Sequence, residues 1–146
     1  QGAYVFLVTV FILESPDYEQ LIQLYVFPAL LSSGILWAIY PITQVYQHKE
    51  DSERGDQTLS ILLGIRGTFL FTALFFGLST LGYFIYFDIE TFLLWLLFLS
   101  PTTIFFLYWF WLIWNDVSQA NFINTMRLNV LAALFLNLFY IFYLLK

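Results

Sequence analysis

The chain has 146 residues, of which 61% are hydrophobic and only 10% are charged, and its net charge at pH 7 is -5. A soluble domain carries about 25% charged residues because its surface must face water, so this composition excludes an ordinary soluble globule. The lack of cysteine excludes disulfides and thiolate metal sites. A single histidine argues against zinc, and an acidic chain without a basic stripe gives nucleic-acid binding no electrostatic support.

Apolar runs separated by short polar breaks make up almost the whole chain. The first run, Ala3 to Leu13, has about eleven residues, too few for a bilayer crossing that needs roughly 20. We interpret it as the end of a helix that begins before Gln1, which makes the chain a piece of a longer protein. Four runs of spanning length follow: Leu21 to Tyr46, Leu59 to Phe87, Phe92 to Trp114 and Leu128 to Leu145. The sequence therefore predicts an all-α, polytopic transmembrane helix bundle with four full spans and one truncated span.

Basic residues gather on one side of this predicted bundle. Counting crossings places four of them together: Lys49, Arg54, Arg66 and Arg127. The opposite side has acidic breaks and one basic residue, the terminal Lys146. Because cytoplasmic loops are enriched in Lys and Arg, we expect an integral protein of the cell inner membrane with loop 47–58 facing the cytoplasm.

Residues 40–58 form the one segment that departs from the apolar background. If the helix continues through this segment, spacings of three and four residues bring four polar side chains to one face: Gln44, Gln47, His48 and Asp51. Hard oxygen ligands suit Mg²⁺, which uses one or two carboxylates together with substrate phosphates. The alternative is a solvated loop whose charges only keep a helix end in water.

The spacing in this segment resembles a known motif. The pattern Gln47-x3-Asp51-x3-Gly55-x2-Thr58-Leu59-x4-Gly64 looks like the second Asp-rich motif of the UbiA family of membrane prenyltransferases. The resemblance implies an all-helical bundle of nine spans that transfers a prenyl chain from an allylic diphosphate to a lipophilic acceptor with Mg²⁺. It also implies that residues 1–146 are a single transmembrane region, the C-terminal half of that bundle, with the N-terminal half as a missing partner.

The resemblance also assigns roles to individual residues. The catalytic role falls to Asp51, Gln47 and Arg54, and the ligands for Mg²⁺ are Asp51, Glu50 and Gln47. Mg²⁺ would neutralise the diphosphate, and basic side chains would stabilise it as it departs: Arg54, Lys49 and Arg66. Aromatic faces would stabilise the allylic cation by cation–π attraction, and Tyr46 is one candidate for that wall of the site.

Departures from the family pattern favour a different function. Gln47 stands where the first carboxylate of the motif is expected, and Asp56 stands where relatives often have Lys. The family's first Asp-rich motif has no counterpart in these residues. The alternative to a prenyltransferase is therefore a non-enzymatic or degenerate membrane protein with a structural or assembly role. The register of Asp51 with Gly55, Thr58 and Gly64 favours the enzyme.

Three further polar residues have two interpretations each. His48 is either a base for the acceptor or, as we favour, a solvated residue at a helix end. Asn129 and Asn137 either line a prenyl cavity or, as we favour, form hydrogen bonds between helices.

Overall fold

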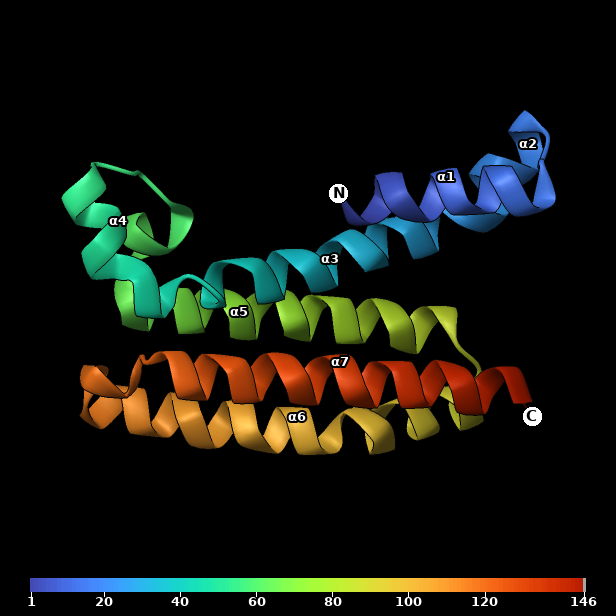
Figure 1. Ribbon diagram of the computed structural model, residues 1–146. Helices are drawn as coiled ribbons and strands as arrows, with labels where there is room; N and C mark the ends of the chain where they lie inside the picture. Colours follow the sequence, from blue (N-terminus) through green and yellow to red (C-terminus); the bar gives the residue numbers. More distant parts are fainter. Residues whose placement is uncertain (146) are drawn as a thin grey trace.

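The computed structural model of the chain describes residues 1–145, which contain helices and turns and no strand (Figure 1). Within these residues the α-helices are α1 (Gly2–Glu14), α2 (Tyr18–Gln20), α3 (Val26–Ile42), α4 (His48–Arg54), α5 (Leu59–Tyr86), α6 (Ile89–Asn115) and α7 (Phe122–Leu145). A π-helical turn, η1 (Leu21–Tyr25), precedes α3, and two 3-10 turns, η2 (Val45–Gln47) and η3 (Val117–Gln119), precede α4 and α7. The predicted all-α class is confirmed. Lys146, which entered the orientation argument, lies outside the described residues.

Four helical stretches are long and apolar enough to cross a membrane: Tyr18–Arg54, Leu59–Tyr86, Ile89–Asn115 and Phe122–Leu145. The remaining apolar helix, α1, has 13 residues and extends about 20 Å, against a hydrocarbon thickness of about 30 Å. The prediction of four full spans and one short apolar helix is confirmed. The chain is an integral membrane protein.

The long helices run up and down, so that their connections gather at two ends of the molecule (Figure 1). We name these the α4 end, residues 43–68 and 111–128, and the α2 end, residues 14–25 and 83–91. α1 packs along α3, α3 packs along α5, and α6 pairs with α7. Thr72 Oγ1 of α5 donates a hydrogen bond to the Ala38 carbonyl of α3 at 2.7 Å, which joins two spans inside the bundle.

Two apolar clusters fill the bundle, one nearer each end. The cluster toward the α2 end includes Trp95, and the cluster toward the α4 end includes Trp109. Phe69 of α5 packs edge-on against Trp109, with the ring centroids 4.8 Å apart. Trp109 Nε1 donates to the Gln119 carbonyl at 2.8 Å. Because a buried indole N–H needs a partner, this bond fixes the connection between α6 and α7 against the bundle.

The helix that leads into the polar segment does not continue to Asp51, as the expected four-residue face requires. α3 ends at Ile42, and the chain then tightens into shorter hydrogen-bonded turns. The Gln47 backbone N–H donates to the Gln44 carbonyl, three residues earlier, at 3.0 Å. Gln44 and Gln47 are thereby separated from α4, which carries His48 and Asp51.

Two local features account for this break. Pro41 has no N–H to continue the helical ladder, although it lies within the last turn of α3. Thr43 Oγ1 donates to the Tyr40 carbonyl at 2.7 Å, a local bond that competes with regular helix. The regular helix of α3 ends beside them at Ile42, within the polar segment.

The last helix begins earlier than its apolar run. α7 starts at Phe122, because the Asn121 side chain accepts a hydrogen bond from the Asn124 backbone N–H at 3.0 Å, an arrangement typical of an N-cap. The polar first turns of α7 therefore belong to the α4 end.

Candidate functional site at the α4 end

The turn between α4 and α5 explains two residues of the sequence pattern. Gly55 ends α4 with φ 77° and ψ 17°, a left-handed conformation that favours glycine. Thr58 then caps α5, because its hydroxyl accepts a hydrogen bond from the Ile61 backbone N–H at 3.2 Å. Both residue types meet a structural requirement of the turn.

Gly64 marks a kink in α5. Its φ of 68° and ψ of 168° are not helical, and this backbone region is accessible essentially only to glycine. The kink separates the first turn of α5, residues 59–63, from the long remainder of the helix. The last glycine of the pattern thus redirects the chain from the α4 end into the span.

Asp51 carries a buried charge. Its exposed fraction is 3%, whereas the other nine Asp and Glu side chains of residues 1–145 are exposed. Its Oδ1 accepts a hydrogen bond from Arg54 Nη2, within the same helix. Arg54 Nε also donates to Asp56 Oδ2 at 3.0 Å. A buried carboxylate needs a paired charge, and Arg54, itself exposed, supplies it.

A chain of polar side chains joins α4 to α5. His48 Nε2 lies 2.7 Å from Ser60 Oγ, which lies 3.1 Å from Thr68 Oγ1. Thr68 Oγ1 donates to the Gly64 carbonyl at 2.8 Å, so Ser60 donates to Thr68 and accepts from His48. Ser60 and Thr68 are fully buried and His48 is half-buried. His48 is therefore not the solvated residue that we expected, because it anchors α4 to α5.

Ser60 and Thr68 were not among the predicted site residues. One signal was present in the sequence: Ser60, Gly64 and Thr68 recur every four residues, which aligns them on one face of a regular helix. Their connection to His48, however, depends on the kink at Gly64, which spacing alone does not indicate.

Gln47 and Tyr46 lie in η2 and contact each other. Gln47 Nε2 donates to Tyr46 Oη at 2.8 Å. The Tyr46 ring packs edge-on against Phe122 of α7, with ring centroids 5.3 Å apart. Lys49 and Glu50 follow in the first turn of α4 and are exposed. The Gln47 amide is thus engaged by its neighbour, while Lys49 and Glu50 face outward.

Arg66 contacts α6. Its Nη2 donates to the Trp114 carbonyl at 2.8 Å, and its guanidinium carbon lies 5.6 Å from the centre of the Trp114 ring. The last carbonyls of a helix favour a cation, so Arg66 stabilises the C-terminal end of α6. Among the basic side chains of residues 1–145, only Arg54 contacts Asp51.

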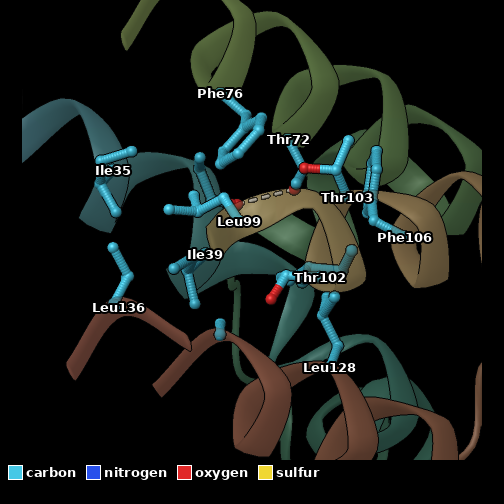
Figure 2. A pocket seen from close by; sticks show the side chains of 13 residues that line it. Ile35, Ile39, Thr72, Phe76, Leu99, Thr102, Thr103, Phe106, Leu128 and Leu136 are labelled. Atoms are coloured by element: carbon cyan, nitrogen blue, oxygen red, sulfur yellow. Dashed lines mark hydrogen bonds between the residues drawn. The ribbon is translucent and has the colours of Figure 1, made fainter. Parts of the chain in front are cut away.

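A cavity of about 40 Å³ lies between α3, α5, α6 and α7 (Figure 2). Its wall is mostly apolar, and Figure 2 shows Thr102 within it between Ile39 and Leu128. The Thr102 hydroxyl is buried and has no hydrogen-bond partner among the described residues. A cavity of about 150 Å³ admits benzene, so this one is too small for a prenyl chain in the present conformation.

Asn129 and Asn137 of α7 do not line this cavity. Asn137 Nδ2 donates to the Ala133 carbonyl of its own helix at 2.7 Å. The hydrogen bond between helices that we favoured for Asn137 is therefore not formed.

The donor set at the α4 end fits Mg²⁺ only in part. Within residues 1–145, no group of three or more His, Asp or Glu side chains is placed to hold a metal ion. Asp51 alone offers a buried carboxylate. One carboxylate is sufficient where substrate phosphates supply further oxygens. The residues fit a shared metal–phosphate site with Asp51 as one ligand, and do not fit a self-contained metal centre.

No protein-family model, curated protein or solved structure matches this chain. The functional argument therefore depends on the residues themselves. At the α4 end these are a buried carboxylate, an exposed guanidinium beside it, and a turn built around Gly55, Thr58 and Gly64.

Proposed function

We propose that the α4 end binds the diphosphate of an allylic prenyl diphosphate together with Mg²⁺, and that the chain takes part in prenyl transfer to a lipophilic acceptor, as in UbiA-like prenyltransferases. One observation carries the proposal. Asp51 is the single buried carboxylate of residues 1–145, and it stands in register with Gly55, Thr58 and Gly64. This is the register of the family motif.

The proposed roles follow from the contacts of Asp51 and Arg54. The Asp51 carboxylate is one oxygen ligand, and the diphosphate and carboxylates from elsewhere in the protein provide the others. Mg²⁺ supplies neutralisation of the diphosphate charge. Arg54 has donors directed to Asp51 and Asp56, and its exposed guanidinium is suited to a phosphate oxygen as well. We leave Arg66 out of this site, because its guanidinium is engaged at Trp114.

We further propose that the protein resides in the cell inner membrane with the α4 end in the cytoplasm. The basic residues of that end support this orientation. A water-soluble diphosphate headgroup would then reach Asp51 from the cytoplasmic side, while its prenyl chain enters the bilayer.

The test compares Asp51→Asn with Asp56→Asn in the full-length protein. Both carboxylates contact Arg54, but only Asp51 is buried. In membranes supplied with a labelled allylic diphosphate, a panel of lipophilic acceptors and Mg²⁺, we expect Asp51→Asn to lower diphosphate release by about 10²-fold or more. Asp56→Asn should stay within a few-fold of the wild type.

Chelation of Mg²⁺ should abolish release by the wild type. Equal rates for Asp51→Asn and the wild type would exclude the proposed role of Asp51. Failure of the folded wild type to bind or convert any allylic diphosphate would exclude the enzymatic function altogether.

A second candidate function is a structural or assembly role in the membrane. It is favoured by the present contacts of the site, since Arg54 already compensates Asp51, Gln47 bonds Tyr46, and the cavity between α3, α5, α6 and α7 is small. In that case Asp51→Asn should lower the thermal stability of the protein, and no allylic diphosphate should bind.

A further inference from the structure

A surface groove lies along the last two turns of α6. It has a volume of about 320 Å³ and is lined by Leu107, Phe110, Trp111, Trp114 and Asn115. Its two indole side chains are more than half exposed, Trp111 at 64% and Trp114 at 54%. The single amide in the wall, that of Asn115, is already bonded to the Trp111 carbonyl at 2.8 Å. The groove therefore offers an apolar, outward-facing surface.

The positively charged guanidinium of Arg66 lies beside Trp114, at the edge of this groove. Arg66 reaches across from α5 and lies over the Trp114 ring. Its hydrogen bond to the Trp114 carbonyl uses one of the five N–H donors of a guanidinium. Both ion pairs among residues 1–145 belong to Arg54, so no carboxylate of the described chain neutralises Arg66.

The position of the groove along α6 matches the edge of a bilayer. α6 spans 27 residues, about 40 Å, so that its final turns reach the headgroup region of a hydrocarbon layer about 30 Å thick. Aromatic residues with polar tips are enriched at that level, and three exposed ones lie in these turns: Tyr108, Trp111 and Trp114. The apolar part of the groove then faces acyl chains, and Arg66 lies at the depth of lipid phosphates.

We propose that this groove binds an anionic phospholipid. Arg66 binds the lipid phosphate, for which the planar guanidinium is well matched, and an acyl chain lies against Leu107, Phe110 and Trp111. Charge complementarity selects the lipid, because an uncompensated cation favours a headgroup of net negative charge over a zwitterionic one. The site is separate from the Asp51 pair and does not depend on prenyl transfer.

The first experiment titrates the full-length protein in detergent with phosphatidylglycerol or phosphatidylcholine and counts bound lipids by native mass spectrometry. We expect preferential binding of phosphatidylglycerol, weakened about tenfold or more by Arg66→Gln, since bonds to a charged group are lost. Arg127→Gln is the matched control, because Arg127 is an exposed arginine of the same end on α7. It should stay within about twofold of the wild type, as expected for an exposed charge outside the groove.

A second measurement needs no arginine variant. Phosphatidylglycerol brominated on its acyl chains should quench the indole fluorescence of the wild type more than brominated phosphatidylcholine does, and Trp111→Phe should remove most of that difference. Inorganic phosphate should not compete, because the acyl contact is missing. Equal binding of the two lipids, equal effects of Arg66→Gln and Arg127→Gln, or displacement by inorganic phosphate would each overturn the proposal.

Discussion

The α4 end and the α2 end carry the same number of carboxylates but different numbers of basic side chains. Five Asp and Glu residues lie at each end: Glu50, Asp51, Glu53, Asp56 and Asp116 at the α4 end, and Glu14, Asp17, Glu19, Asp88 and Glu90 at the α2 end. The α4 end also holds every basic side chain of residues 1–145: Lys49, Arg54, Arg66 and Arg127. The α2 end has none among those residues.

The two ends also use their polar groups differently. At the α2 end, Asp17 forms a capping box with Gln20, and Asp88 Oδ1 accepts hydrogen bonds from the backbone N–H groups of Glu90 and Thr91. These are bonds within one helix cap, although this end also has one bond between elements, from the Tyr25 hydroxyl of η1 to the Glu14 carboxylate of α1. At the α4 end, the polar chain runs from the half-buried His48 to the buried Ser60 and Thr68, and it joins two helices. We therefore expect changes in the polar chain of the α4 end to affect the packing of α4 on α5, and changes in the caps of the α2 end to remain local.

The largest expected effect concerns which side of the membrane each end of the bundle faces. The chain has no cysteine, so single-cysteine variants report one position each. Ser52→Cys tests the α4 end and Tyr18→Cys the α2 end, and both residues are exposed. Because basic residues favour the cytoplasm, a membrane-impermeant maleimide should label Tyr18→Cys in intact cells and Ser52→Cys only after lysis. The reverse pattern would show that the basic residues do not set the orientation.

The next effect concerns the backbone at the α4 end. An added methyl group at Gly64 or at Gly77 meets no atom within 4 Å, but only Gly64 has a positive φ. Gly64→Ala should destabilise the protein by about 1–3 kcal/mol, whereas Gly77→Ala, inside regular helix, should stabilise it by about 0.5–1 kcal/mol. Thermal unfolding in detergent measures both. Similar shifts for the two variants would mean that the kink at Gly64 is not required.

An effect of similar size is expected from the polar chain that joins His48, Ser60 and Thr68. Ser60→Ala removes the hydroxyl between His48 and Thr68 and leaves both without that partner, which costs about 1–3 kcal/mol. Ser100→Ala is the control, because its hydroxyl bonds only the Leu97 carbonyl of its own helix. If both variants unfold at the wild-type temperature, the polar chain does not hold α4 to α5.

The sequence predicted the spans well, because membrane insertion requires long apolar runs. The ends of those runs were less predictable. Polar residues start α7 at Phe122, six positions before the apolar run, because Asn121 caps the helix. Pro41 and Thr43 lie where α3 ends, at Ile42 within the polar segment, and no hydropathy pattern distinguishes that break from a continuous helix.

The candidate site was predictable in its residue types and not in its contacts. Spacing singled out Asp51, and the structure shows it buried beside Arg54. The family resemblance also grouped Arg66 with the same site, although its partner, Trp114, lies 48 residues away in the sequence. Contacts of that kind depend on how α5 and α6 pack together. Because a lone sequence carries no signal for this packing, the contact of Arg66 with Trp114 could not have been foreseen.

The smallest effect concerns the cap of α6. Hydrogen bonds from the Thr91 side chain and backbone and from the Glu90 backbone hold the pKa of Asp88 below its usual range. A carboxyl group whose pKa is lower in the folded state stabilises the protein at any pH above its unfolded-state pKa, about 3.9. This stabilisation is lost as the pH falls through the lower pKa of the folded state. At neutral pH, Asp88→Ala should therefore lower the unfolding temperature by a few degrees, and the difference from the wild type should shrink in acid.

Asp88→Asn provides the matched control for this cap. An asparagine accepts the same backbone hydrogen bonds without a charge, so it should keep most of the stability and show no titration between neutral pH and pH about 3. If Asp88→Ala instead unfolds at the wild-type temperature at every pH, the caps of the α2 end do not contribute measurably. The two ends would then differ more in their contributions to stability than we propose.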